Sequence, residues 1–152
     1  MAGVGEEKEI CLSFPSRSAL FRSFSHESAT AAVGPTIPIV ANEFEDVALI
    51  GGGSGITPLY QLLNHALNDP TNRTRYTLLY ANVTEADILL RDELAALQRA
   101  HPHTFKVVHT LDNPPSSRWS GAKGYVSREL IKAHVPSAEK GDKVKVLICG
   151  TS

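Results

Sequence analysis

The sequence has little of what defines several protein classes. Its 2 cysteines, Cys11 and Cys149, are far apart and lack the spacing of metal ligands, so we expect neither a disulfide framework nor a metal site. No apolar run approaches the roughly 18 residues that span a bilayer. The net charge of -1 provides no basic surface for nucleic acid or for an anionic membrane. We therefore expect an intracellular, soluble chain with no nucleic-acid partner and no membrane segment.

Residues 1–34 also lack a regular pattern, because their apolar residues follow neither a strand nor a helix period. The stretch 16–25 has the serine and arginine bias of an organelle transit peptide, whereas the glutamates within residues 6–9 argue against one. We predict an irregular or disordered segment over residues 1–34 and a single folded domain over residues 35–152.

The folded part contains continuous apolar runs that are typical of strands buried on both faces. These runs predict strands over residues 46–50, 76–81, 105–110 and 143–148.

Helical periods and capping residues lie between the predicted strands. Thr57 and Pro58 suit the start of a helix that ends at residues 68–70. Residues 84–87 resemble a capping box, and Ser127 suits the cap of a short helix ending at His134. The apolar stripe predicted for the second helix consists of Ile88, Leu89, Leu94 and Leu97.

Strand and helix thus alternate, which predicts an α/β fold with a parallel, doubly wound, Rossmann-like sheet of about four strands. Ligands of such sheets bind beyond the carboxyl ends of the strands. The alternation therefore places four loops along one rim of the sheet, namely residues 51–57, 82–87, 111–124 and 149–150.

A glycine-rich loop, Gly51-Gly52-Gly53-Ser54-Gly55, joins the first of these strands to the first helix. Glycines at this position let backbone amides approach an anion closely, and the helix dipole favours negative charge there. The loop therefore predicts a phosphate or pyrophosphate site. A tight turn that binds no ligand is the alternative.

Several nucleotide motifs do not fit this loop. A P-loop requires a lysine after Gly55, where Ile56 stands, and both the G-x-G-x-x-G fingerprint and the G-x-S-x-G nucleophile elbow require a glycine at Ile56. The G-x-G-x-G form of a methyltransferase fits, but Leu49 and Asn82 stand where its acids are expected. An S-adenosylmethionine-dependent methyltransferase stays a minor alternative.

Residues 51–58, GGGSGITP, closely resemble the NADH-binding signature of the ferredoxin-reductase-like flavoenzymes, and among these the NADH–cytochrome b5 reductases. Three more segments resemble that family in the family's order: residues 78–90, 110–125 and 146–150. The Gly34-Pro35 stretch and the sequence of residues 119–124 look most like the fungal mitochondrial type of this family. This resemblance implies a mitochondrial location, at the outer membrane or in the intermembrane space.

The resemblance implies a role for individual residues. Asp112 and Tyr125 fall where the family holds the adenosine ribose and adenine, and a carboxylate there favours NADH because it repels the 2′-phosphate of NADPH. The alternatives are that Asp112 begins a turn, that Tyr125 packs in the core, and that Cys149 is a small buried residue at a strand end. No catalytic side chain is predicted. The expected cofactor-binding residues are Gly52, Gly53, Ser54, Gly55, Thr57, Asp112, Tyr125, Cys149 and Gly150.

The chain departs from the family at both ends. The flavin motif R-x-Y-T/S-x-x-S is absent, and the family's C-G-P-P is replaced after Gly150 by Thr151-Ser152. The resemblance implies NADH and FAD as cofactors of the whole reductase and cytochrome b5 as its partner. We expect this chain to carry only the NADH-binding half, and a truncated, non-catalytic nucleotide-binding module is the alternative.

Overall fold

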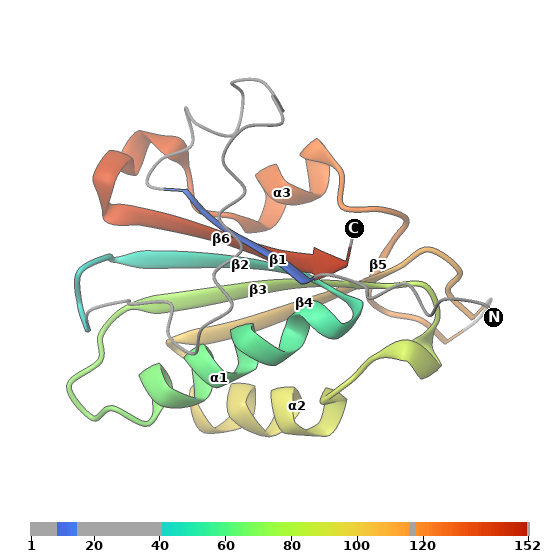
Figure 1. The fold of residues 1–152 in the computed structure, drawn as a ribbon, viewed down its shortest axis with the longest axis horizontal. Helices are drawn as coiled ribbons and strands as arrows, with labels where there is room; N and C mark the ends of the chain where they lie inside the picture. Colours follow the sequence, from blue (N-terminus) through green and yellow to red (C-terminus); the bar gives the residue numbers. More distant parts are fainter. Residues whose placement is uncertain (1–8, 15–40, 116–117, 152) are drawn as a thin grey trace, which may run out of the picture.

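The computed structural model describes residues 9–14, 41–115 and 118–151, which build a six-stranded sheet in the order β1-β6-β2-β3-β4-β5 (Figure 1). Neighbours from β6 to β5 pair in parallel, and β1 runs antiparallel along β6. The predicted α/β fold with a parallel, Rossmann-like sheet is confirmed. The strands are β1 (Glu9–Phe14), β2 (Asp46–Gly52), β3 (Arg75–Asn82), β4 (Phe105–Leu111), β5 (Ala122–Lys123) and β6 (Val144–Thr151).

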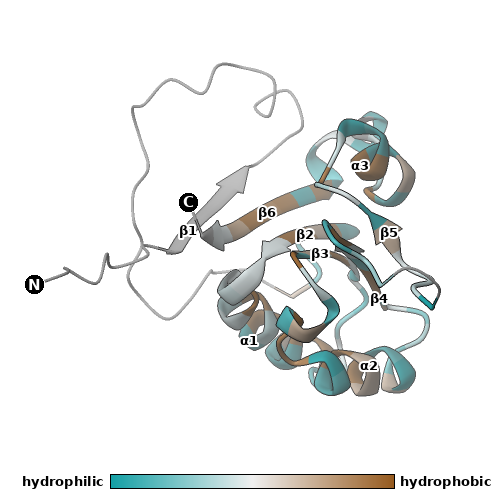
Figure 2. Cartoon of the chain, turned by 90° about the vertical axis from the view of Figure 1, so that its right-hand side faces the viewer, coloured by the Kyte–Doolittle hydropathy of each residue, from teal (hydrophilic) through white to brown (hydrophobic). Residues whose placement is uncertain are grey.

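Helices cover both faces of the sheet, as the doubly wound pattern predicts. α1 (Ile56–Leu67) and α2 (Arg91–Ala100) lie on one face, and α3 (Arg128–His134) lies on the other (Figures 1 and 2). The described residues also contain the 3-10 helices η2 (Gly53–Gly55), η3 (Glu85–Asp87) and η4 (Ala138–Lys143). Within the described part of the chain, no helix is long and apolar enough to cross a membrane.

The core consists of two layers, one on each face of the sheet. Val47 and Leu49 of β2 point into the layer under α1 and α2, whereas Ala48 and Ile50 point into the layer under α3. Because successive side chains of a strand point to opposite faces, a strand buried on both sides must be apolar throughout. Full burial of a leucine such as Leu49 contributes about 1.5–3 kcal/mol.

Two strands were not predicted. Residues 9–14 form β1, so the expectation of an irregular segment over residues 1–34 is wrong there, and the remainder of that segment lies outside the described residues, as does Gly34-Pro35. β1 pairs with β6 through main-chain hydrogen bonds along that edge of the sheet. Such bonds do not require the alternation of apolar and polar side chains by which strands are predicted. β5 has only two residues and lies within the predicted loop 111–124. The estimate of about four strands was therefore too low.

The first helix begins earlier than its capping signals predict. Gly55, rather than Thr57, is the residue that precedes α1, because η2 leads directly into the helix. Pro58 is then the third helical residue. It is tolerated because the first N–H groups of a helix have no partner within the helix. The predicted end of the helix is confirmed, since Asn68 follows its last residue.

The predicted capping box exists, but it closes a single 3-10 turn. Asp87 Oδ2 accepts from Thr84 N at 2.9 Å and from Thr84 Oγ1 at 2.7 Å. Leu90 then adopts a left-handed conformation with φ 54°, and α2 begins after it. This break separates the members of the predicted stripe, because Leu89 is 48% exposed whereas Ile88, Leu94 and Leu97 are buried.

Ion pairs hold the amino end of the sheet. Asp46, the buried first residue of β2, accepts from Arg75 Nε at 2.7 Å and from Lys140 Nζ at 2.5 Å. Burial raises the pKa of the Asp46 carboxyl, but the hydrogen bonds and charges of Arg75 and Lys140 outweigh burial and leave the pKa below its ordinary value. A more exposed pair, Lys143 with Glu45 at 2.8 Å, lies beside it.

Candidate functional site at the carboxyl rim

The carboxyl ends of the parallel strands lie at one edge of the sheet, at the right-hand side in Figure 1. The register places Gly51 of β2 beside both Tyr80 of β3 and Cys149 of β6, so these strands end at similar heights. The four loops expected at this edge are brought together there, and we call them the carboxyl rim: residues 51–57, 82–87, 111–124 and 149–150.

The glycine loop is packed tightly on its inner side. A Cβ atom at Gly55 would collide with the carbonyl oxygen of Cys149 and lie 2.7 Å from the Cα of Gly150. These neighbours are backbone atoms, which cannot move aside cheaply. Glycine is therefore required at position 55 by the close approach of the loop to the end of β6.

The outer side of the same loop is open. A Cβ atom at Gly52 or Gly53 would meet nothing within 4 Å, and Gly53 has φ +52°, a conformation that favours glycine. Neither η2 nor α1 has a side chain capping its first N–H groups. The N–H of Ile56, the first residue of α1, already donates to Gly53 O, so the donors left for the open side are those at the start of η2, as a pyrophosphate requires.

A buried phenol supports the loop from below. The hydroxyl of Tyr80, which is 0% exposed, donates to the carbonyl oxygen of Gly53 at 2.9 Å. No role for Tyr80 was predicted from the sequence. The available signal was a tyrosine near the carboxyl end of a predicted strand, because a buried phenol needs a hydrogen-bond partner.

Asp112 and Tyr125 are brought together by the base of the loop 111–124. Thr110 Oγ1 donates to Gly124 O at 2.6 Å, and Gly124 N donates to Leu111 O at 2.7 Å. These bonds bring the residue after Gly124 close to the end of β4. Asp112 is partly buried in a bend and donates its N–H to Asn82 O at 3.1 Å.

Tyr125 is 80% exposed, so the alternative that it packs in the core is wrong. An aromatic ring left in solvent can stack on a planar base. The turn alternative for Asp112 agrees with its bend and is compatible with a ligand role for its side chain.

The inner side of the loop 111–124 is held by aromatic contacts. Trp119 Nε1 donates to Ala122 O at 2.8 Å, and its ring lies 6.5 Å from the ring of His109, centroid to centroid. Arg91 of α2 lies 6.0 Å from the centre of the Trp119 ring. Burial and the charge of Arg91 lower the pKa of His109, so this side chain is neutral near pH 7.

Cys149 and Gly150 reach the rim at the end of β6, as predicted. The Cys149 side chain is 1% exposed and belongs to the core under α1. This placement matches the alternative in which Cys149 is a small buried residue at a strand end. Its backbone, rather than its sulfur, forms the floor of the glycine loop.

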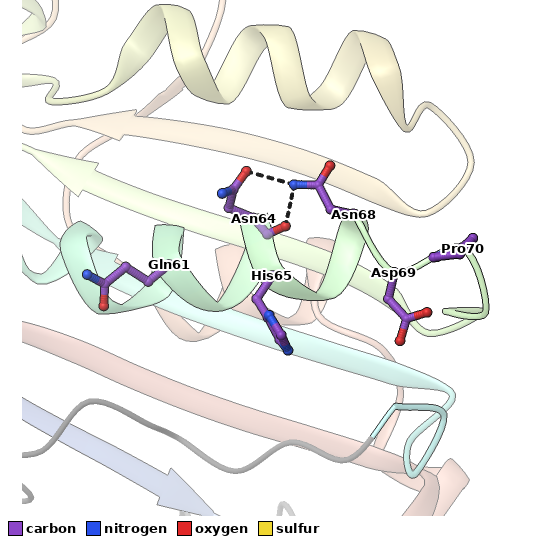
Figure 3. Close-up of a pocket in the computed structure, with 6 residues that line it drawn as sticks. All are labelled: Gln61, Asn64, His65, Asn68, Asp69 and Pro70. Carbon is purple, nitrogen blue, oxygen red and sulfur yellow. Dashed lines mark hydrogen bonds between the residues drawn. The ribbon is translucent and has the colours of Figure 1, made fainter.

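A second concave surface lies at the other end of α1. Figure 3 shows an open depression lined by polar residues of the last helical turns, where Asn68 Nδ2 donates to Asn64 O at 2.7 Å. It is separated from the glycine loop by the length of the helix, and none of the predicted site residues borders it. Its lining consists of Gln61, Asn64, His65, Asn68, Asp69 and Pro70.

Comparison with known proteins gives a family match. Residues 49–152 match the family model described as the oxidoreductase NAD-binding domain. The chain is 46% identical over 116 residues to NADH-cytochrome b5 reductase 2 of Aspergillus terreus, covering 76% of this chain and 36% of that protein. It is 48% identical to the Botryotinia fuckeliana protein of the same name, covering 76% of this chain and 33% of that protein. The chain spans about a third of the length of these curated relatives.

Solved structures give the same match. The cytochrome b5 reductase domain of Ulva prolifera nitrate reductase superposes with a TM-score of 0.66 at 36% identity, covering 70% of this chain and 39% of that one. The CS-b5R domains of human Ncb5or, in their NAD+ form, superpose with a TM-score of 0.54 at 36% identity, covering 60% and 25%.

Proposed function

The chain belongs to the oxidoreductase NAD-binding domain family, and from this premise we propose that its carboxyl rim binds NADH for an NADH–cytochrome b5 reductase. One observation carries the proposal. The glycine loop is packed against β6 on its inner side and open on its outer side, where helix-start N–H groups face a space that a Cβ atom would enter. That cradle fits a pyrophosphate.

In this proposal the glycine loop and the helix start hold the pyrophosphate. Gly52, Gly53, Ser54 and Gly55 contribute backbone N–H groups, and the exposed Thr57 contributes a hydroxyl from the first turn of α1. The partial positive charge of the helix start favours the anion. The glycine loop by itself suits any small anion such as sulfate. The contacts with adenosine, elsewhere on the rim, are therefore what would select a dinucleotide.

Asp112 and Tyr125 are the proposed adenosine contacts. The carboxylate of Asp112 suits the paired hydroxyls of a ribose and repels a 2′-phosphate, and the exposed ring of Tyr125 stacks on adenine. The proposal therefore includes a preference for NADH over NADPH. The family match removes support from the methyltransferase alternative.

The nicotinamide end is proposed to lie towards Cys149 and Gly150, at the end of β6. In the whole protein NADH supplies a hydride and FAD is its acceptor, from which electrons pass to cytochrome b5. These activities are proposals for the complete reductase, because the chain spans about a third of its curated relatives. A mitochondrial location, inferred from the resemblance to the fungal mitochondrial type, is proposed with them.

The ligand preference can be tested by substituting Asp112. Asp112→Ala should weaken NADH binding about three- to tenfold and leave the weaker NADPH binding unchanged or improved, because one charge-assisted contact and one repulsion are removed. Asn113→Ala, the neighbouring exposed position, is the matched control and should change neither. Equal losses for NADH and NADPH in Asp112→Ala would reject the ribose role.

The reductase activity needs its own test. The protein should be purified, inspected for the absorbance of bound flavin, and assayed for NADH-driven reduction of ferricyanide and of cytochrome b5. Flavin binding with NADH-driven reduction supports the reductase. NADH binding without flavin or turnover supports the alternative of a non-catalytic nucleotide-binding module.

A further inference from the structure

Strand β3 contains two buried tyrosines on the same face of the sheet. Tyr76, near the amino end, is 2% exposed, and Tyr80, near the carboxyl end, is 0% exposed. Both rings belong to the core layer under α1 and α2. Only the Tyr80 hydroxyl reaches the glycine loop, where it donates to Gly53 O at 2.9 Å.

The bond to Gly53 has a geometric consequence for the next residue. The Gly53 carbonyl and the Ser54 N–H belong to one planar, trans peptide unit, so they point in opposite directions. When Tyr80 holds the carbonyl towards the core, the Ser54 N–H points away from the core. Gly53 has the positive φ of 52°, and open space lies above it, so side-chain packing does not hold this peptide.

The hydroxyl of Tyr80 also has neighbours other than Gly53. Burial raises the pKa of Tyr80, whereas contacts with the Leu89 backbone and the Asn82 side chain lower it. Asn82 is buried at the end of the same strand, and neither of its amide atoms makes a hydrogen bond of good geometry to a described residue. The contact from Asn82 is therefore loose. Contacts that lower the pKa of a phenol donate to its oxygen, so the hydroxyl's own hydrogen is directed by the bond to Gly53 O.

We propose that Tyr80 is a positioning residue, whose hydroxyl turns the Gly53–Ser54 peptide so that the Ser54 N–H faces the pyrophosphate of NADH. The inference rests on the proposed function of the rim. Tyr80 itself is buried and does not touch the ligand. It sets the affinity for ligands that carry a pyrophosphate by presenting a donor before the ligand arrives, which reduces the ordering cost of binding.

Other contacts limit the size of the effect. The N–H of Ile56 also approaches Gly53 O, so the peptide keeps one restraint when the hydroxyl is removed. Loss of one neutral hydrogen bond then predicts about a three- to tenfold weaker affinity for a pyrophosphate ligand. The contacts of adenosine with Asp112 and Tyr125 lie on another loop and should not change.

The test compares Tyr80→Phe with Tyr76→Phe, the same chemical change at the other end of the same strand. Dissociation constants are measured for NADH, for ADP-ribose, which retains the pyrophosphate, and for adenosine, which lacks it. Tyr80→Phe should weaken NADH and ADP-ribose about three- to tenfold and leave adenosine unchanged. Tyr76→Phe should leave all three unchanged. Thermal unfolding of each variant establishes that the compared proteins are folded.

A purely structural role for Tyr80 predicts a different pattern. Equal losses for adenosine and ADP-ribose, or equal losses in the two variants, would overturn the inference. Unchanged NADH affinity in Tyr80→Phe would overturn it while the proposed function stands. If the unsubstituted protein binds neither NADH nor ADP-ribose at millimolar concentration, the proposed function fails first and the inference fails with it.

Discussion

The two ends of strand β2 serve different purposes. At its amino end, Asp46 is buried and has its charge matched by Arg75 and Lys140. At its carboxyl end, Gly52 begins a loop whose outer side is open and whose N–H groups lack a side-chain cap. One end satisfies its polar groups internally, and the other has no side chain that does so. The contrast agrees with a stabilising role for the amino end and with the proposed binding of NADH at the carboxyl rim.

The largest expected effect is at Gly55, where a substitution should reduce both the stability of the fold and the affinity for NADH. In Gly55→Ala the new Cβ would lie 2.7 Å from the Gly150 Cα, so the loop must separate from β6. We expect about 1–3 kcal/mol less stability and more than about a tenfold loss of NADH affinity. Denaturant unfolding and NADH titration measure the two effects.

Gly52→Ala is the matched control at the same loop. Gly52 has the extended backbone of φ -127°, and its Cβ would enter open space. The stability of Gly52→Ala should stay within about 0.5 kcal/mol of that of the unsubstituted protein. Its affinity for NADH should fall, because the new methyl group would occupy the proposed pyrophosphate space. If Gly52→Ala binds NADH normally, the open side of the loop is not the pyrophosphate site.

The next effect should change stability and leave binding intact. Asp46→Asn removes a carboxylate that accepts from both Arg75 and Lys140, so unfolding should become easier by about 1–3 kcal/mol at pH 7. The NADH dissociation constant should not change, because the substitution lies at the other end of the sheet. Glu45→Gln, at the exposed pair with Lys143, should cost much less stability than Asp46→Asn, because solvent screens that pair.

The same carboxylate predicts a dependence on pH. Because the pKa of Asp46 is lower in the folded protein than its ordinary value of 3.8, its stabilisation is complete above that value. It is lost as the pH falls through the lower, folded pKa. Unfolding measured between pH 5 and about pH 2 should show a shallower loss of stability in Asp46→Asn. Identical slopes in the two proteins would contradict this assignment.

The smallest expected effect is at His109, beneath the loop 111–124. Burial and Arg91 place the folded pKa of His109 below its ordinary value of 6.5, so the unfolded chain binds this proton more readily. The free energy of unfolding should therefore decline as the pH falls below about 6.5, by less than about 1.5 kcal/mol near pH 5.5. In His109→Gln this decline should be absent, and its persistence would assign the decline to another group.

The sequence predicted the parallel strands well because their signal is local. A strand buried on both faces, such as β2, must be apolar throughout, and the glycines that end it are visible without tertiary context. β1 was missed because its pairing with β6 uses the main chain. The late start of α2 was missed because Leu90 adopts a left-handed conformation, which a leucine in the sequence does not indicate.

The position of the rim loops was predicted from the sequence, but the contacts that support them were not. The order of the loops along a parallel sheet placed the glycine loop, Asp112 and Tyr125 on one rim, as the structure has them. The contact of Tyr80 with Gly53 depends on how closely the loop approaches β3, which the apolar pattern of the strand does not encode. Likewise, the burial of the Cys149 side chain follows from its register beside Gly51.

The most direct test of the central claim is a titration of the isotope-labelled chain with NADH, followed amide by amide by NMR. If the carboxyl rim binds NADH, chemical-shift changes should be concentrated at Gly52–Gly55, Asp112 and Tyr125, with unchanged amides at Asp46 and along residues 64–69. Changes centred on residues 64–69, or spread evenly over both ends of the sheet, would contradict it.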